Sequence, residues 1–315
     1  MNLWFLLGKR IGAAALTLLI VSAIVFSITN LLPGDAAQAM LGQSGTPQAI
    51  NALREALGLN LPAPQRYFNW LTGLISGDAG YSLTSALPVS ELIGDRLPRS
   101  LVLAGLTAFL SVPIALALGI GSAMYSGSAI DRNLSLITLI MVAMPEFLLA
   151  TLAVLIFAVK LRWFSALSSP PADATLSEFA SAYTLPVVTL LFVIVAQMAR
   201  MTRAAVIDQL SQPYVEMAVL KGASLRRVVL RHALPNAIGP IANAVALGLS
   251  YLLGGVIIVE VIFGYPGIAS LMVDAVTNRD MPLLQACAMV FCFAYLILVL
   301  IADICAIFAN PRLRS

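Results

Sequence analysis

Residues able to carry out chemistry are sparse in this chain, and they do not form a catalytic pattern. The single histidine, His232, is not part of a His-Glu-x-x-His zinc motif. The Gly-x-Ser-x-Gly turn of serine hydrolases and the Gly-x-x-x-x-Gly-Lys-Ser/Thr loop that binds nucleotide phosphates are both absent. Cys287, Cys292 and Cys305 do not have zinc-ligand spacing. We therefore expect no catalytic residue, no metal site and no ATP hydrolysis in the chain itself.

Three acidic residues fall inside long apolar runs, where a charge is costly and faces other protein or water. Glu146 follows Pro145, and two interpretations stay open: it lines a path for a polar solute, or it is a protonated or hydrogen-bonded residue that supports a proline kink. Glu260 is expected about one turn from the outer end of its run, within reach of water or an external arginine. That position favours a gating or structural role over direct solute contact. Asp303 is expected to pair with a cytoplasmic arginine.

The longest polar segment between two apolar runs in the second half of the chain, residues 202–236, has the pattern of two short helices. Pro213 suits the first turn of a helix that Ser211 caps, and Gly222 suits the left-handed residue that ends it. Ser224 can cap a second helix, which Pro235 is expected to end just before the next apolar run. This second helix carries the basic residues Arg226, Arg227 and Arg231.

The first of these short helices has an apolar side formed by Val215, Val219 and Leu220. A helix this short is not stable alone in water, so its apolar side must be buried against something. That surface is the membrane, the bundle of the chain itself or a partner protein. Physical grounds alone do not decide between a helix held on the membrane surface by arginines that bind anionic lipid and a helix that docks on a partner.

The elements that must position these residues are membrane spans. Of the 315 residues, 60% are hydrophobic and 10% are charged, whereas soluble domains carry about a quarter charged residues. A span needs about 20 apolar residues. The first run is longer than the apolar core of a signal peptide and lacks a small-residue cleavage site, so we interpret it as a retained span. The runs that are long enough are Ile11–Leu32, Leu101–Tyr125, Leu134–Val159, Leu185–Met201, Ile238–Phe263 and Leu283–Phe308.

Six spans predict an all-α polytopic membrane bundle with both termini on one side. Basic residues concentrate in the segments that are cytoplasmic if the termini are, and the positive-inside rule therefore places both termini in the cytoplasm. The predicted parts are a first span (1–32), an external segment (33–99), a five-span core (100–308) that includes the cytoplasmic segment 202–236, and a tail (309–315). The external segment contains a helical stretch from Pro47 to Leu57. Its apolar and aromatic residues are expected to pack a small subdomain or to lie at the membrane interface; they include Tyr67, Phe68 and Trp70.

The cytoplasmic segment resembles a known family signature. Glu216-Met217-Ala218 is followed by three residues, Gly222, nine residues and then His232-Ala233-Leu234-Pro235. This resembles the "EAA" loop of binding-protein-dependent ABC importer permeases, in which Glu-Ala-Ala, three residues, Gly, nine residues and Ile-x-Leu-Pro follow one another. Met217 replaces an alanine of that pattern and His232 replaces the isoleucine.

The resemblance implies a type I importer permease and its partners. In that family two similar permeases enclose a path, an external binding protein delivers the solute, and each EAA helix lies in a cleft of a cytoplasmic ATPase subunit that binds ATP and Mg. Membrane lipid is also an expected partner; nucleic acid is not, because a net charge of +3 is too weak. The resemblance assigns the ATPase contact to Glu216, Met217, Ala218, Val219, Leu220, Gly222, Leu234 and Pro235. Glu146 and Glu260 are candidates for the path because they are acids inside apolar runs.

Further motifs resemble the dipeptide, oligopeptide and nickel branch of the family. They are Leu31-Leu32-Pro33-Gly34-Asp35, Gly254-Gly255 ahead of Glu260 and Phe263, Tyr265-Pro266-Gly267-Ile268, Asn278-Arg279-Asp280 with Pro282, and Asn310-Pro311-Arg312-Leu313-Arg314. The branch implies a solute such as a dipeptide, an oligopeptide, glutathione or a nickel chelate, and the sequence leaves the choice open.

Two other classes of protein were weighed. A membrane-embedded enzyme is disfavoured because no catalytic groups assemble. A secondary transporter or channel that acts as a homo-oligomer is the alternative function, although no inverted repeat is visible in the sequence. The two transport hypotheses differ in fuel, since only the importer permease needs an ATPase partner.

Overall fold

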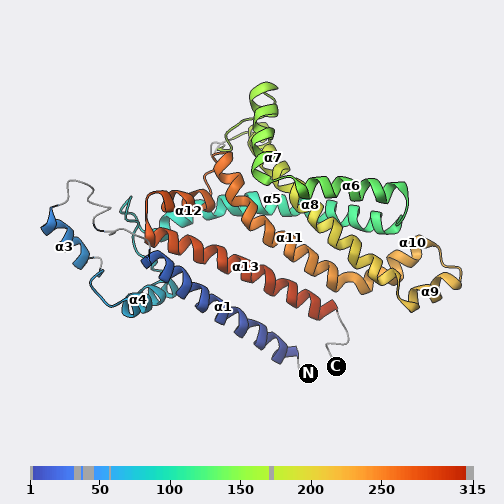
Figure 1. Cartoon of the computed structure of the whole chain (residues 1–315), viewed down its shortest axis with the longest axis horizontal. Coiled ribbons are helices and arrows are strands. Elements are labelled where there is room, and N and C mark those ends of the chain that lie inside the picture. Colours follow the sequence, from blue (N-terminus) through green and yellow to red (C-terminus); the bar gives the residue numbers. More distant parts are fainter. Residues whose placement is uncertain (1–2, 32–36, 38–45, 57, 170–173, 310–315) are drawn as a thin grey trace. The chain divides into compact units, whose positions relative to one another are not determined.

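The computed structural model describes residues 3–31, 37, 46–56, 58–169 and 174–309 (Figure 1). These residues are predominantly helical, and their only β pairing is an isolated bridge between Tyr81 and Pro88. The motif at residues 310–314 and all of the motif at residues 31–35 except Leu31 lie outside the described residues. Leu57, the predicted end of the helix that begins at Pro47, lies outside them as well. The helices are α1 (Leu3–Leu31), α3 (Pro47–Ala56), α4 (Ala63–Ser76), α5 (Val89–Met124), α6 (Ala129–Ala143), α7 (Glu146–Ala153), η2 (Val154–Lys160), α8 (Leu176–Leu210), α9 (Pro213–Leu220), α10 (Leu225–Arg227), η3 (Val228–Ala233), α11 (Leu234–Ile262), α12 (Ile268–Thr277) and α13 (Met281–Ala309).

The number of spans agrees with the sequence if one bent pair is counted as a span. Among the described residues, five helical stretches are long and apolar enough to cross a bilayer. The sixth predicted run, Leu134–Val159, is divided between α6 and the pair α7–η2, which are bent by 92° relative to each other. The bend lies at Met144 and Pro145, where the backbone is extended (φ −83° and ψ 126°, then φ −63° and ψ 134°). A proline restricts the residue before it to extended conformations, so the helix stops there rather than kinking.

Two helices extend well beyond the predicted runs. α5 begins at Val89 rather than at Leu101, and α8 runs from Leu176 to Leu210 rather than from Leu185 to Met201. Hydropathy marks only the part of a helix that suits lipid, whereas the helix ends where its terminal backbone groups are capped. α8 begins at a capping box in which the backbone N–H and the hydroxyl of Thr175 both bond the Glu178 carboxylate at 2.8 Å.

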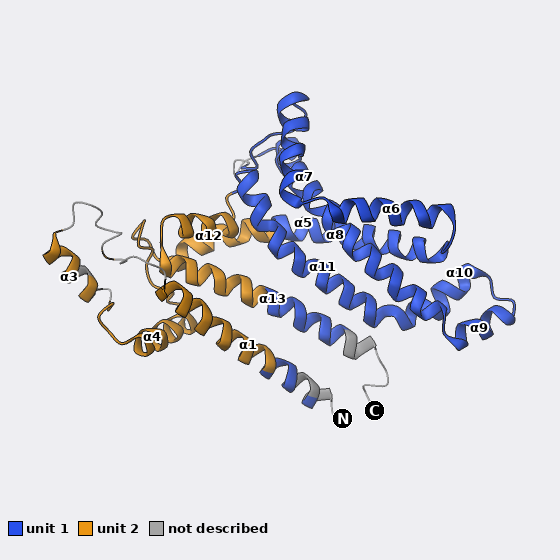
Figure 2. Cartoon of the chain, viewed as in Figure 1, with its two compact units in different colours: residues 1–12, 102–265, 295–315 blue, residues 13–101, 266–294 orange. Residues whose placement is uncertain are grey.

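The chain forms two compact units, coloured separately in Figure 2. Unit 1 comprises residues 1–12, 102–265 and 295–315, and unit 2 comprises residues 13–101 and 266–294. In unit 1, α8 and α11 pack along each other, and α6 and α7 pack against α8. The close approach of α8 to α11 uses Gly248, where an added methyl group would lie 2.6 Å from the Met198 side chain. A larger residue at position 248 would therefore displace the end of the Met198 side chain.

One end of unit 1 is held by an apolar cluster and an ion pair. Buried residues from α5, α8, η3 and α11 form the cluster: Ala123, Ala205, Val206, Val229, Ala237 and Ile241. Beside it, the Arg203 guanidinium of α8 donates two hydrogen bonds to the Asp131 carboxylate of α6, at 2.7 and 2.8 Å. The Ser122 hydroxyl of α5 donates a third at 2.6 Å. These contacts join α5, α6 and α8 at the end where α9 begins.

Unit 2 has a separate core. Its buried residues come from the start of α5, from α12 and from α13, and they are Val89, Ile268, Leu271, Ala275, Leu283, Ala286 and Cys287. α4 packs on α1 through an aromatic cluster of Phe26, Tyr67 and Trp70. The Tyr67 and Ser22 hydroxyls are 2.8 Å apart in the same contact. The predicted aromatic residues thus pack α4 against the first span, while Phe68 stays 62% exposed.

Candidate functional site

The predicted two-helix segment starts with α9, and its caps differ in part from the prediction. Pro213 occupies the first turn as expected, but the N-cap residue is Gln212, and Ser211 instead ends α8. The end of α9 matches the prediction: Gly222 is left-handed, with φ 79°. Its N–H donates to the Val219 carbonyl at 2.9 Å, and the next N–H, of Ala223, donates to the Ala218 carbonyl at 3.2 Å. This bond pair is the Schellman motif, which satisfies the terminal carbonyl groups of a helix.

The apolar side of α9 is only partly buried within the chain. Val215 is 2% exposed, but Val219 and Leu220 on the same apolar side are 53% and 73% exposed. Met217 is also exposed, as is Glu216, whereas Ala218 is half-buried. Among the described residues, α9 makes its main contacts with η3 and α8, and it lies at the end of unit 1 (Figure 1). Its last turn is a small apolar surface that the described residues do not cover.

The second helix of the segment does not end at Pro235 as predicted. α10, η3 and α11 form one continuous helical stretch from Leu225 to Ile262, and Pro235 lies in the first turn of α11. η3 is a π-helix, whose wider turn changes the hydrogen-bonding register ahead of the proline. We attribute the continuity to this register change, because a proline inside a regular α-helix would lose a bond and clash with the preceding turn. Leu234 is half-buried and Pro235 is exposed.

Two of the three acidic residues in apolar runs have clear surroundings. The Arg10 guanidinium lies 2.9 Å from the Asp303 carboxylate, which confirms the predicted pairing with an arginine. Glu260 is completely buried, so of its two expected surroundings the contact with water is wrong for this structure, while the contact with an external arginine stays a prediction. Whether Glu260 borders a solute path stays a prediction.

Glu146 is placed differently from the other two acids. It is the first residue of α7, directly after the 92° break, and its side chain is half-buried. Its carboxylate lies over Gly255 of α11: a methyl group added there would be 3.0 Å from one oxygen and 3.2 Å from the other. The same methyl group would lie 3.0 Å from the Leu190 side chain of α8. α7, α8 and α11 thus meet at this carboxylate.

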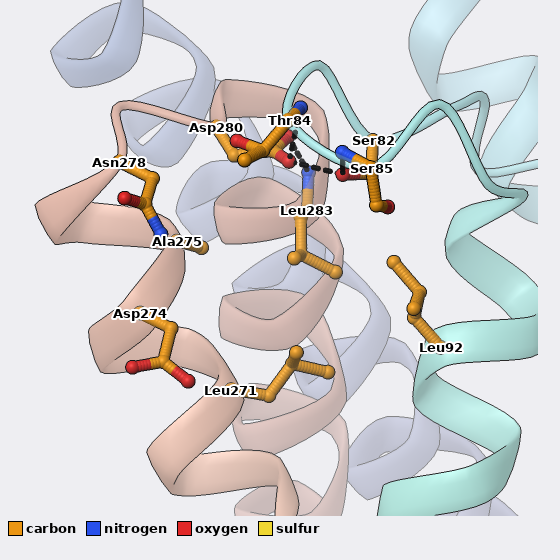
Figure 3. Close-up of a pocket in the computed structure, with 10 residues that line it drawn as sticks. All are labelled: Ser82, Thr84, Ser85, Leu92, Leu271, Asp274, Ala275, Asn278, Asp280 and Leu283. Atoms are coloured by element: carbon orange, nitrogen blue, oxygen red, sulfur yellow. Dashed lines mark hydrogen bonds between the residues drawn. The ribbon is translucent and has the colours of Figure 1, made fainter.

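Unit 2 contains a polar network that sequence reasoning did not find (Figure 3). The buried carboxylate of Asp280, just before α13, accepts hydrogen bonds from the Ser82 hydroxyl at 2.5 Å and from the Thr84 backbone at 3.3 Å. It also accepts one from the backbone N–H of Leu283, at 3.4 Å. A pocket of about 130 Å³ lies beside these residues, with Asp274 and Asn278 on its wall. Asp280 therefore joins the loop after α4 to the start of α13.

Comparison with known families and structures decides between the two transport hypotheses. Residues 115–315 match the family described as binding-protein-dependent transport system inner membrane component, and residues 2–104 match the N-terminal model of the same system. The chain belongs to this family. It is a permease, the non-catalytic inner-membrane subunit of an ABC importer, and it is a multi-pass membrane protein of the peptide branch. The secondary-transporter alternative is therefore not retained.

Individual relatives cover the permease almost completely. It is 32% identical over 306 residues to the probable peptide ABC transporter permease y4tP of Sinorhizobium fredii, covering 97% of this chain and 98% of the relative. It is 35% identical to the glutathione transport system permease GsiC of Salmonella choleraesuis, covering 97% of both. A chain of the inward-facing MetNI methionine ABC transporter matches with a TM-score of 0.55 and 16% identity, over 70% of this chain and 96% of that one. This likeness confirms the predicted type I permease fold.

Proposed function

We propose that the permease imports peptides, including short ones such as glutathione, which an external binding protein delivers. The relatives y4tP and GsiC are named as peptide and glutathione permeases. The observation that carries the mechanism is α9: a short helix, ended by a fully hydrogen-bonded turn at Gly222, with exposed apolar side chains on its last turn. Such a surface suits a rigid helix that is pushed by a partner.

The partner that fits this surface is an ATPase subunit, which would bind ATP and Mg. The proposed contact residues are Glu216, Met217, Ala218, Val219, Leu220 and Gly222, with Leu234 and Pro235 at the start of α11. Burial of exposed methionine, valine and leucine side chains supplies the affinity, and Glu216 meets a basic group of the partner. Because α10, η3 and α11 are continuous, movement of this end is passed directly into a membrane span.

The remaining assignments follow from the same proposal. Both termini and residues 202–236 face the cytoplasm, and residues 33–99 are external, where they shape the outer mouth or receive the binding protein. Residues 100–308 form the five-span core and residues 309–315 the tail. A second, similar permease completes the path, lipid covers the remaining apolar faces, and Glu146 and Glu260 belong to the path region.

The test is purification of the tagged permease from its host in mild detergent. A second permease and one or two ATPase chains are expected to copurify, and both ATPase association and ATP-dependent peptide uptake should fall when Leu220 is changed to Asp. Leu225→Asp is the control, since Leu225 is 53% exposed and lies beyond the Gly222 turn. Purification of the permease alone, with uptake that needs no ATP, would refute the proposal.

A further inference from the structure

We infer that the Glu146 carboxylate binds the positively charged amino group of the transported solute, and that Gly255 holds this carboxylate in place. The inference rests on the proposed function, because it names the chemical group of the solute that this residue recognises. Peptides carry an ammonium group at the amino terminus, and glutathione carries one as well. The recognised chemistry is therefore a primary ammonium group, whatever the rest of the solute.

The first argument is that the carboxylate has no partner in the part of the permease that the structure describes. Among the described residues, no hydrogen bond or ion pair to Glu146 is present, whereas Asp131 and Asp303 are each paired with an arginine. Gly255 lies beside the carboxylate, and a methyl group added to Gly255 would also meet the buried side chain of Leu190. Intramembrane acids normally pair with other groups or mark ion and substrate pathways. An acid without an internal partner, half-exposed in an apolar span, fits the second role.

The second argument is the backbone beside it. α6 ends at Ala143, and Pro145 has no N–H to offer the preceding turn. Within the described residues, no N–H from beyond the break donates to the carbonyl groups of residues 141–144. Non-helical backbone at membrane depth is tolerated where it is buried in protein or lines a water-filled cavity. The carboxyl end of α6 is negative and the amino end of α7 is positive, so the full charge that attracts a cation and repels an anion at this break is that of the Glu146 carboxylate.

The third argument is the fit between Glu146 and α11. Gly255 is buried beneath the carboxylate, while its neighbour Gly254 is exposed and has open space where a side chain would be. Any side chain at position 255 would displace the carboxylate or Leu190. Gly255 is thus a positioning residue, and Gly254 provides a control on the same helix with the same change in helix propensity.

The main experiment measures uptake by the complete importer, with its binding protein, in proteoliposomes. The probes are radiolabelled alanyl-alanine and glutathione, each compared with its N-acetylated form. Glu146→Gln is expected to lower the initial uptake of the free-amine probes at least about tenfold, and Glu146→Asp should restore part of it. ATP hydrolysis stimulated by the binding protein should stay within about twofold of wild type, which a folding defect would not allow.

The acetylated probes complete a cycle analogous to a double-mutant cycle, in which one change is made in the permease and the other in the solute. If Glu146 binds the amino group, removing the carboxylate and removing the charge on the solute cost no more together than singly. Equal uptake by wild type and Glu146→Gln would overturn this inference alone. Wild-type uptake of neither probe would overturn the proposed function, and this inference with it.

Gly255→Ala should lower uptake of the free-amine probes by less than Glu146→Gln does, because the added methyl group shifts the carboxylate or Leu190 by only a few tenths of an ångström, and Gly254→Ala should transport like wild type. Equal uptake by the two glycine variants would overturn the positioning role of Gly255.

A further measurement does not depend on the solute. Ala143, the last residue of α6, is exposed, and it is changed to Cys in a permease whose three native cysteines are replaced by alanine. A cationic methanethiosulfonate reagent is expected to react several-fold faster than an anionic one, and Glu146→Gln should abolish most of this difference. No reaction with either reagent, or no charge preference, would overturn the inference.

Discussion

The turn at Gly222 and the break at Pro145 both interrupt a helix, but they leave the backbone in different states. At Gly222 the terminal carbonyl groups of α9 accept N–H donors from the turn itself, and the nearby side chains are apolar and exposed. At Pro145, among the described residues, the carbonyl groups before the break lack such donors and the adjacent Glu146 carboxylate has no partner. In the proposals above, the closed turn is therefore a rigid surface for a protein and the open break a polar site for a small solute.

The largest effect is expected from changing Gly222 to Val. A β-branched residue at φ 79° costs about 1–2 kcal/mol and would tilt the end of α9, so ATP-dependent uptake should be lost while membrane insertion is kept. Gly127 is the matched control, since its φ is 80° and its side-chain position is also open. Gly127→Val should lose similar stability but retain most uptake. If both variants lose uptake equally, strain alone explains the defect.

A medium effect is expected from changing Asp131 to Asn, which tests how the two regions are joined. Asp131 is in α6, which leads to the break, and Arg203 is in α8, which leads to α9. The variant leaves the Arg203 charge without its partner and should cost about 1–3 kcal/mol of stability, measured by thermal unfolding in detergent. The double variant Asp131→Asn with Arg203→Gln should cost less than the two single changes added together. Additive losses would mean that the two residues do not interact.

The smallest effect is expected from changing Asp303 to Asn. Its partner side chain, Arg10, is 55% exposed, and such exposed pairs contribute about 0–1 kcal/mol. The same thermal unfolding measurement checks this value, and high salt should reduce even that small difference. If Asp303→Asn lowered stability as much as Asp131→Asn does, solvent exposure would not explain the difference expected between the two ion pairs.

Patterns in the sequence predicted the spans, the helix at Pro47 and the left-handed Gly222, because each depends on residues close together in the chain. The break at Pro145 was not predicted as a break, since hydropathy continues through it and a proline in an apolar run suits a kink equally well. The π-helical turn that carries the chain through Pro235 has no sequence signal. The N-cap of α9 was predicted at Ser211, a residue type that favours this position, but the helix begins one residue later, after Gln212.

Contacts between distant residues could not be predicted either. Asp131 and Arg203 are 72 positions apart, and Ser82 and Asp280 are 198 apart. Gly254 and Gly255 look alike in the sequence, and only the position of Glu146 distinguishes them. The residues assigned to the ATPase contact remain predictions until the complex is tested.

Because the helical stretch from Leu225 to Ile262 is continuous, a small tilt at one end produces a larger displacement at the other. Gly255 lies 30 positions along it from Leu225, which corresponds to about 45 Å at about 1.5 Å per residue. A tilt of about 5° about the Leu225 end would then move Gly255 by about 4 Å, more than the length of a hydrogen bond. Gly255 would move away from Glu146 while the Leu225 end of the helix moved very little. Binding and release of a solute at Glu146 would then need no hinge inside the span.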